Sequence, residues 1–360
     1  DLLDILDKPG RVTEIIAAEL AEIKAAFGDK RRSEIVVHAQ EMSMEDLITP
    51  QDVVVTLSNT GYIKAQVLDE YRTQKRGGRG KQAATTKEED FIEKLFIANT
   101  HDYILCFTNR GRMFWLKVYE VPQGGRTARG KPIVNLLKME DNERVNAILP
   151  VKEFDAQHYV FMATAFGTVK KTPLSEFSRP RSAGIIAVSL DEGDHLIGVA
   201  ITNGENDVML FSDEGKANRF DETEVRAMGR GARGVRGIKL GAGAQVISLL
   251  VAENEAQSVL TATENGYGKR TPVGDYSRHG RGGQGVIAIS TSARNGKVVA
   301  ATLVQPDDEV MLITTGGVLI RTRVSEIRSL GRSTQGVTLI NLGEGEKLSG
   351  LQRVLDSEEE

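Results

Sequence analysis

The chain has 360 residues and a mass of 39.3 kDa, more than one ordinary hydrophobic core accommodates, which predicts several domains or one closed array of repeated units. Its 37 Gly and its low aromatic content of 5% favour short strands and tight turns over packed helices. The net charge is −4, and the acidic side chains of residues 356–360 account for all of it. We interpret these residues as the start of an acidic tail. The rest of the chain is balanced in charge, so overall charge does not exclude a nucleic acid partner.

Residues 1–33 differ in pattern from the rest of the chain. Apolar residues recur here every three or four positions, at Val12, Ile16, Leu20, Ile23 and Phe27. This spacing predicts one amphipathic helix of about four turns that ends at Gly28. Such a helix is too short to form a coiled coil alone, but it could be the end of one that begins upstream. A polar linker is predicted over residues 34–51.

Six copies of one pattern occupy residues 52–355. In each copy an apolar run reaches a hydroxyl residue and then a turn glycine, 48 to 56 residues after the previous one, at Gly61, Gly111, Gly167, Gly215, Gly266 and Gly317. A second glycine follows 19 residues later in five copies and 17 later in the third, at Gly80, Gly130, Gly184, Gly234, Gly285 and Gly336. A period near 50 indicates an array of similar structural units. The lone Cys106 lies inside one apolar run, so we interpret it as a core residue.

Each copy carries four strand signals, which in the fourth copy cover residues 208–212, 216–220, 235–240 and 245–251. The first two flank a glycine turn and the last two flank Gly-Ala-Gly, which predicts two hairpins. Four strands in each of six units predict an all-β, six-bladed, propeller-like domain, because radial repetition protects the edges of sheets. The alternative of a two-sheet sandwich with a fused copy does not explain six similar periods. Periodicity leaves open whether neighbouring blades exchange strands.

Basic residues keep the register of the repeats at two places. Four positions before the second glycine the copies hold Arg76, Arg126, Arg230, Arg281 and Arg332, with Arg179 and Arg181 in the shortened third copy. Three or four positions after the turn glycine they hold Lys64, Lys170, Lys171, Arg219, Lys269, Arg270 and Arg321. Four more basic residues lie in or beside the same segments, namely Arg129, Lys131, Arg233 and Arg278. The second copy departs from the pattern, with Phe114 and Trp115 at the second place.

We interpret this set as a basic band along one rim, because equivalent positions of a closed array face the same way. The alternative, solvated surface charge, has no reason to follow the repeat. A basic band beside Gly-rich loops suits the phosphates of duplex DNA, whereas the lack of a recognition helix and the scarcity of aromatic residues disfavour sequence-specific and single-strand binding. The five histidines lack metal-ligand spacing and no Ser–His–Asp set is evident, so neither a metal site nor an active site is expected. No long apolar stretch or signal peptide is found, which predicts a cytoplasmic protein.

The first copy also contains the heptad QKRGGRG at residues 74–80. This heptad resembles the GyrA box, the signature of the C-terminal domain of the DNA gyrase A subunit. Segments at residues 88–107, 129–137 and 265–273 resemble the same family in proteobacteria, and the helix through residue 35 resembles the end of its coiled-coil arm. The resemblance covers essentially the whole chain. It implies a six-bladed β-pinwheel that exchanges strands between blades.

The resemblance also implies a function. The domain would wrap DNA around a basic rim and give the enzyme a right-handed crossing to convert into negative supercoils. Within the box, Lys75, Arg76 and Arg79 would hold phosphates at one end of the wrap, and glycines would permit close backbone approach; the whole box is Gln74, Lys75, Arg76, Gly77, Gly78, Arg79 and Gly80. The implied partners are double-stranded DNA, the rest of a homodimeric gyrase A subunit, together with the gyrase B subunit in an A2B2 enzyme.

ATP and Mg are implied for that whole enzyme, and no cofactor is expected for this chain. Two alternatives stay open. The first is the equivalent domain of topoisomerase IV, in which the box is degenerate and the blades are usually fewer, so the intact heptad favours gyrase. The second is a protein-interaction propeller, although the repeats lack the GH…WD signature of such proteins.

Overall fold

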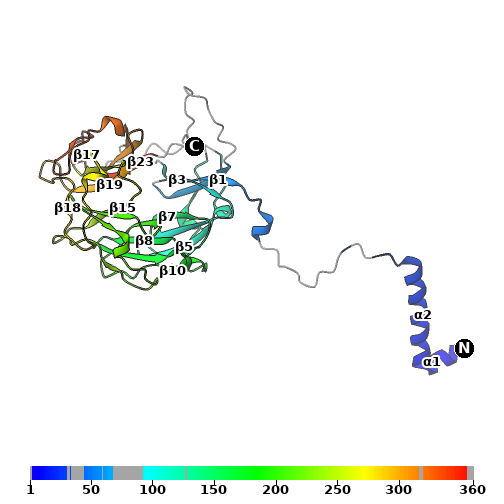
Figure 1. Ribbon diagram of the computed structural model, residues 1–360. Coiled ribbons are helices and arrows are strands. Elements are labelled where there is room, and N and C mark those ends of the chain that lie inside the picture. The colour runs from blue at the N-terminus through cyan, green and yellow to red at the C-terminus, as the bar shows by residue number, and fades with distance from the viewer. Residues whose placement is uncertain are drawn as a thin grey trace. The chain divides into compact units, whose positions relative to one another are not determined.

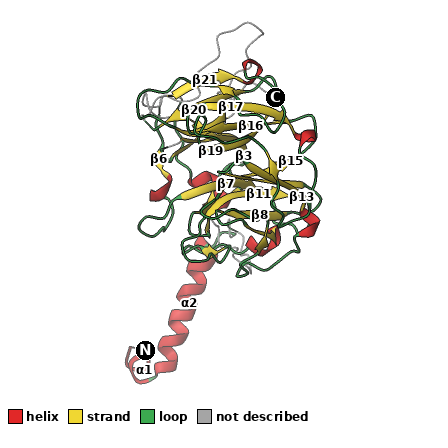
Figure 2. Ribbon diagram, turned by 90° about the vertical axis from the view of Figure 1, so that its left-hand side faces the viewer, coloured by secondary structure: helices red, strands yellow, loops and turns green. Residues whose placement is uncertain are grey.

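The structure, a computed structural model, describes residues 2–30, 33, 44–58, 60–67, 92–125, 128–315 and 319–354. The chain forms two compact units, Asp1–Leu47 and Ile48–Glu360. The first unit contains helices and the second is built mainly from β-strands (Figures 1 and 2). In the part of the chain that the structure describes, none of the helices has the length and apolar character needed to cross a membrane.

The first unit confirms the predicted helix. Its elements are α1 (Leu2–Asp7), α2 (Pro9–Phe27) and the 3-10 helix η1 (Met44–Leu47). Proline suits the start of α2, since the first helical amides have no partner within the helix. At the other end, the Gly28 amide donates to the carbonyl of Lys24, and a Cβ at Gly28 would lie 2.3 Å from that oxygen. The apolar face of α2 is exposed, and the short α1 is an element that the sequence pattern did not predict.

The second unit contains six antiparallel sheets, five of four strands and one of three, among the described residues. Their orders are β3-β1-β2-β6, β10-β5-β4-β7, β11-β8-β9-β14, β15-β12-β13-β18, β19-β16-β17-β22 and β21-β20-β23. The longer strands are β1 (Asp52–Ser58), β2 (Tyr62–Val67), β3 (Ile92–Asn99), β4 (Tyr103–Thr108), β5 (Arg112–Lys117), β7 (Val145–Val151), β8 (Tyr159–Thr164), β9 (Thr168–Pro173), β11 (Leu196–Thr202), β12 (Asp207–Ser212), β13 (Lys216–Asp221), β15 (Val246–Ala252), β16 (Ser258–Thr263), β17 (Tyr267–Pro272), β19 (Val298–Val304), β20 (Glu309–Thr314), β21 (Leu319–Arg323) and β23 (Leu348–Val354). The predicted all-β fold of six blades is confirmed.

One short strand of each four-stranded sheet belongs to the following repeat. These exchanged strands are β6 (Lys131–Pro132), β10 (Ile185–Ile186), β14 (Val235–Arg236), β18 (Val286–Ile287) and β22 (Val337–Thr338). For example, β14 follows the β12–β13 hairpin in the chain, yet Val235 pairs with Val169 of β9 in the preceding blade. Strand exchange, implied by the family resemblance, is therefore present.

This exchange corrects one prediction from the sequence. Residues 235–240 and 245–251 were expected to form a hairpin, but β15 pairs with β12 instead, with Val208 opposite Val251. Only two residues of the first segment are in a strand. The prediction failed because a short apolar segment pairs equally well with either neighbouring blade, and its sequence does not say which one.

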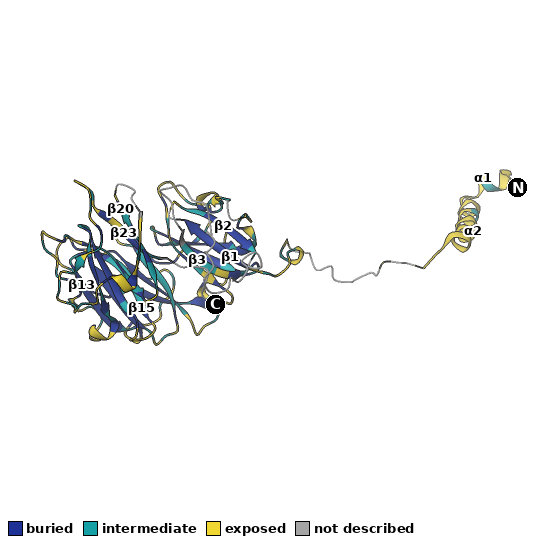
Figure 3. Cartoon of the chain, turned by 90° about the horizontal axis from the view of Figure 1, so that it is seen from above, coloured by how far each residue is buried: buried dark blue, intermediate teal, exposed yellow. Residues whose placement is uncertain are grey.

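The hydrophobic cores lie between consecutive blades. Alternate residues of β12 face opposite neighbours, because successive side chains of a strand point to opposite faces. Val208 and Leu210 pack toward Phe161 of the preceding blade, whereas Met209 and Phe211 pack toward the following one. All six residues of β12 are buried, and Figure 3 shows buried strand segments through this unit. Cys106 is buried in the core between the first two blades, as predicted, and burial raises the pKa of its thiol to about 12.

The two edges of each sheet have different places in the ring. The edge strands β7, β11, β15, β19 and β23 contact one another in succession, and β23 also contacts β3. These strands therefore surround the axis of the ring. The exchanged strands occupy the opposite edge of each sheet, and β10 and β18 lie at the outer margin in Figure 1. Segments that lead into the exchanged strands thus reach the perimeter.

In the repeats where the structure describes it, the second glycine is required by close backbone contact. Gly234 and Gly285 immediately precede exchanged strands and have φ values of +107° and +69°. A Cβ at Gly285 would lie 2.3 Å from the carbonyl oxygen of Ala217, and one at Gly234 would lie 2.4 Å from that of Val169. Glycine is needed because it tolerates positive φ and lets the exchanged segment approach the preceding blade.

We expect the substitution Gly285→Ala to lower the free energy of unfolding by about 2 kcal/mol or more, because the left-handed conformation of an L-residue costs roughly 1–2 kcal/mol before the steric clash is added. Gly283→Ala is the matched control, since a Cβ there would lie 3.5 Å from its nearest neighbour, the carbonyl oxygen of Gly280. Urea unfolding followed by circular dichroism compares the two variants. Equal unfolding midpoints for both would contradict the role of Gly285.

Candidate nucleic-acid interface

From the second repeat onward, a segment of each repeat crosses over the preceding blade before it forms the exchanged strand. We call these segments the crossover loops: residues 121–130, of which 126–127 are not described, 178–184, 225–234, 276–285 and 327–336. Backbone contacts tie them to the preceding hairpin. The amide of Met228 donates to the carbonyl of Lys171 over 2.8 Å, and that of His279 donates to the carbonyl of Arg219 over 2.7 Å. The loops are thus held against the second strand of the preceding hairpin.

The basic residues predicted for the rim differ in how far they are exposed. Seven are exposed: Arg129, Lys131, Arg179, Arg181, Arg233, Arg278 and Arg321. Four are half-buried: Arg230, Arg270, Arg281 and Arg332. Arg126 and the heptad at residues 74–80 lie outside the described residues, so their role stays a prediction. The crossover loops therefore present most of their basic side chains to solvent at the margin of the blades.

The remaining basic residues are buried, and this part of the predicted rim is wrong. Lys64, Lys170, Lys171, Arg219 and Lys269 each expose 7% or less of their surface. Their side chains run beneath the crossover loops, where their N–H groups meet backbone carbonyl oxygens. The register of these residues has a structural cause, because buried carbonyl groups of each crossing segment need donors. They are not available to contact phosphates directly.

Lysines three positions after the turn glycine donate to the crossover loop above them. Lys170 Nζ donates to the carbonyl of Ala187 over 2.7 Å and to that of Arg230. Lys269 Nζ donates to the carbonyls of Gly331 and Arg332, each over 2.5 Å. Burial lowers the pKa of both ammonium groups to about 8, with a smaller contribution from the charge of the arginine above each. Lys64 Nζ contacts Gly125 O over 3.2 Å, and burial lowers its pKa also.

In the second, third and fourth repeats the residue four positions after the turn glycine donates instead to the 3-10 turn that begins the crossing. Lys171 Nζ donates to the carbonyl of Glu222 in η6 (Glu222–Glu224) over 3.0 Å. Trp115, which broke the basic pattern in the sequence, donates from its indole N–H to the carbonyl of Phe177 in η5 (Leu174–Phe177) over 2.7 Å. In these repeats the position holds a long side chain with an N–H donor, whether or not that side chain is charged. Trp115 fulfils this structural role.

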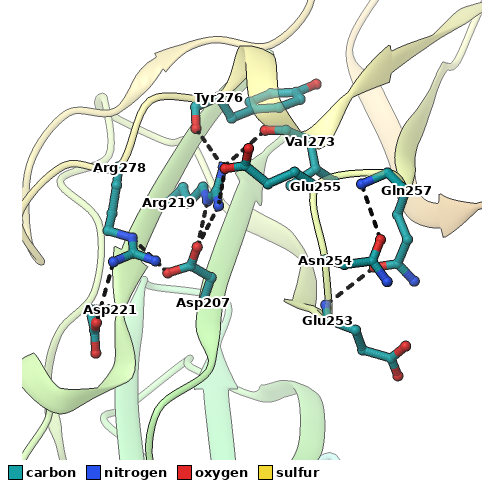
Figure 4. A network of polar contacts seen from close by, with 11 residues as sticks. Asp207, Arg219, Asp221, Glu253, Asn254, Glu255, Gln257, Val273, Tyr276 and Arg278 are labelled. Carbon is teal, nitrogen blue, oxygen red and sulfur yellow. Dashed lines mark hydrogen bonds and ion pairs between the residues drawn. The ribbon is translucent and has the colours of Figure 1, made fainter.

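The fourth repeat extends this contact into a network of charged groups (Figure 4). Arg219 donates to the carbonyls of Val273 and Tyr276, each over 3.1 Å, and its guanidinium binds the Asp207 carboxylate at 2.5 Å. The other oxygen of Asp207 lies 2.9 Å from Nε of Arg278, whose Nη1 lies 3.6 Å from an Asp221 oxygen. Two carboxylates therefore hold Arg278 at the surface and offset part of its charge.

Some residues of this interface were missed by the sequence analysis. Arg226 and Arg328 are exposed at the start of their crossover loops, and Arg236 is exposed on β14. The first two share a signal, since each lies 11 residues after a turn glycine. Asn218 was also missed. Its amide occupies the place of the buried lysines in the fourth repeat and donates to the carbonyls of Gly237 and Gly280, over 2.9 and 3.3 Å.

Comparison with known families identifies the array. A family described as "DNA gyrase C-terminal domain, beta-propeller" matches six segments, at residues 52–99, 102–152, 158–203, 206–253, 257–305 and 308–354. The chain belongs to the DNA gyrase C-terminal domain family. The six matched segments coincide with the six repeats, and from the second onward each family unit corresponds to one hairpin with its crossover loop and axial strand.

Relatives of this gyrase domain are similar over most of its length. The chain is 57% identical over 346 residues to the DNA gyrase A subunit of Salmonella typhimurium, covering 96% of this chain and 39% of that protein. With the DNA gyrase A subunit of Neisseria gonorrhoeae it shares 51% identity over 402 residues, covering 100% of this chain and 44% of the other. The chain thus spans less than half the length of these relatives.

Two solved structures resemble the domain. The C-terminal domain of DNA topoisomerase IV matches with a TM-score of 0.76 and 26% identity, covering 85% of this chain and 94% of that one. A DNA gyrase A C-terminal domain matches with a TM-score of 0.65 and 27% identity, covering 85% of this chain and 100% of the other. The two identities are too close to separate the enzymes, whereas the sequence relatives above belong to gyrase.

A charge substitution tests the structural role assigned to Lys171. Its ammonium lies 3.6 Å from the Glu222 carboxylate, and Glu222 is fully buried. We expect Lys171→Met to lower the free energy of unfolding by about 3–5 kcal/mol, because it leaves a buried carboxylate unpaired. Lys152→Met, at an exposed lysine, is the control and should change it by less than about 0.5 kcal/mol.

The double variant Lys171→Met, Glu222→Gln should recover part of this loss, because the neutral amide can still accept from the amides of Gly204 and Asn206. Denaturant unfolding of all four proteins provides the comparison. If Lys171→Met is as stable as Lys152→Met, the buried pairing does not stabilise the blade.

Proposed function

We propose that this chain binds duplex DNA along the outer margin of its blades, without sequence preference, and wraps it. The observation that supports this is the repeated placement of loop arginines. Arg230, Arg281 and Arg332 occupy the same position of three successive crossover loops, which lead to the exchanged strands at the perimeter. A row of cations spaced by one blade follows a curved path, and a DNA backbone that contacts every member must curve with it.

Phosphate binding is the chemistry that suits these loops. Guanidinium groups pair with phosphate oxygens, and the glycines beside them allow backbone N–H groups to come equally close. Bending a duplex through a half-turn at a radius of about 40 Å costs on the order of 10 kcal/mol. One arginine does not offset that cost, but several loops in succession do, since each neutralised phosphate adds a salt-dependent contribution to affinity.

Within a whole enzyme, the wrap would give gyrase the handed DNA crossing that ATP-dependent strand passage converts into negative supercoils. The gyrase relatives and the heptad at residues 74–80 support gyrase rather than topoisomerase IV. The proposal includes as partners the gyrase B subunit together with the remainder of gyrase A, with ATP and Mg used by other parts of the enzyme. It assigns this chain a non-catalytic, cytoplasmic role.

The salt dependence of binding tests the assignment of individual arginines. For the double variant Arg179→Ala, Arg181→Ala, in the crossover loop of the third repeat, we expect weaker binding to a relaxed duplex. The slope of log affinity against log salt should fall by about 0.9 for each lost phosphate contact. Lys138→Met, Lys152→Met is the control, because these exposed lysines lie outside the crossover loops. Salt-insensitive binding by the unsubstituted chain would overturn the proposed function.

The heptad is tested in the complete enzyme. In a gyrase that contains Lys75→Ala, Arg76→Ala and Arg79→Ala, we expect loss of negative supercoiling because one end of the wrap loses its phosphate contacts. Relaxation or decatenation, which need no wrap, should persist. Topology assays on closed circular DNA measure both activities, with Lys138→Met, Lys152→Met as the control. Supercoiling at the normal rate would show that the heptad does not act in this way.

A further inference from the structure

Three of the six hairpins place a lysine directly under the crossover loop of the following repeat. These residues are Lys64, Lys170 and Lys269, in the first, third and fifth repeats. All three are buried, with exposed fractions of 2% or less. A solvated lysine normally keeps its ammonium in water, so a buried one needs a specific set of acceptors. Here the acceptors are carbonyl oxygens of crossover loops for all three lysines.

The acceptors include the backbone of the loop arginines themselves. Lys170 Nζ donates to the carbonyl of Arg230, and Lys269 Nζ donates to those of Gly331 and Arg332. Arg230 and Arg332 are the residues that stand four positions before the second glycine. Each ammonium is thus hydrogen-bonded to the main chain of an arginine that, under the proposed function, contacts a phosphate.

We propose that Lys170 and Lys269 are positioning residues for DNA binding: each holds the backbone of a phosphate-contacting arginine from beneath and supplies a second layer of positive charge. This inference rests on the proposed function. The physical reason is preorganisation, because a loop that is already fixed loses less conformational freedom when DNA binds. The buried ammonium itself cannot reach a phosphate, so its effect on DNA passes through the loop and through the local field.

The fourth repeat shows that a neutral donor can serve the same place. Asn218 Nδ2 donates to the carbonyl of Gly280, the residue before Arg281. In that loop the arginine has further support, because its own amide donates to the Glu224 carboxylate over 2.7 Å and its guanidinium donates to the carbonyl of Arg236 over 2.8 Å. The hydrogen bond to the loop and the positive charge beneath it are therefore separable contributions to DNA binding. A glutamine in place of Lys170 or Lys269 retains the hydrogen bond and removes the charge.

The charge can be followed by its titration. The pKa of Lys170 and of Lys269 is lowered to about 8 by burial, with further lowering from Arg230 and Arg332 and an opposing effect of Asp275 on Lys269. As pH rises through about 8 these lysines lose their charge in the folded chain, and DNA affinity should fall. Stability should change in the opposite direction, because between pH of about 8 and 10.5 the unfolded chain binds more protons than the folded one.

The experiment compares the full 360-residue chain with three variants. Lys170→Met, Lys269→Met removes the donors and the charge, and Lys170→Gln, Lys269→Gln keeps donors without charge. Lys138→Met, Lys152→Met removes two exposed charges outside the crossover loops. Amide hydrogen exchange of residues 225–236 and 327–338 reports how firmly the loops are held without DNA. Affinity for a relaxed duplex at constant salt is measured from pH 7 to about 9.5, below the ordinary lysine pKa.

We expect the unsubstituted chain and the exposed-lysine control to lose affinity with rising pH. The methionine variant should bind about tenfold more weakly at pH 7, exchange its loop amides faster and show a flat pH profile. The glutamine variant should keep slow exchange and also show a flat profile, so a folding defect in the methionine variant does not decide the result. Normal loop exchange in the methionine variant, or a normal pH profile in the glutamine variant, would overturn the positioning role. If the unsubstituted chain itself fails to bind DNA, the proposed function fails first, and the two failures are distinguishable.

Discussion

A strand of two residues makes few ladder hydrogen bonds. Among the described residues, however, five such strands leave their own repeat and pair with the preceding blade. β14 pairs only Val235 and Arg236 with the preceding blade. What holds the crossing segment is a set of contacts on either side of the short strand. Gly234 lets the backbone approach closely, and donors from β9 satisfy carbonyl groups before it. In the third blade the exchange therefore depends on one glycine and two donor side chains, Lys170 and Lys171.

This constraint explains why basic residues follow the repeat even where they never meet solvent. A side chain that must cross from a hairpin to a carbonyl on the next segment has to be long and to end in an N–H group. Lysine, arginine and tryptophan all fulfil that need, as Lys171, Arg219 and Trp115 show. Burial of the charged ones is unfavourable, which is why the pKa of Lys170 falls to about 8. Register among basic residues is thus not by itself evidence of a shared binding surface.

The same contacts connect the fold to the proposed DNA track. Loop arginines reach the perimeter because the chain must travel there to form the exchanged strand, and the loops are firm because the hairpin below supplies donors. In the fourth repeat, Asp207 joins the two functions directly, since it binds buried Arg219 with one oxygen and exposed Arg278 with the other. The structural arginine of the fourth blade and an exposed arginine of the crossover loop above it therefore share a single carboxylate.

Much of the architecture was predictable from the sequence, namely those features that depend on residues close together in the chain. Six glycine-marked repeats predicted six blades, and the first hairpin of the fourth copy was predicted at nearly its observed bounds, with residues 208–212 and 216–220 against β12 and β13. These features are local: a turn glycine and two alternating runs specify a hairpin without help from elsewhere. Family membership was equally readable, because it depends on the order of residues alone.

Tertiary structure alone decided which segments pair and which cations face water. A two-residue strand such as Val235–Arg236 carries no mark of its partner strand, and its pairing depends on a hairpin more than 60 residues earlier in the chain. In the sequence, Lys170 and Arg230 both belong to one predicted basic band. In the structure, the crossover loop that contains Arg230 covers Lys170. Burial is a property of what covers a residue, and the loops that cover Lys64, Lys170 and Lys269 come from the next repeat.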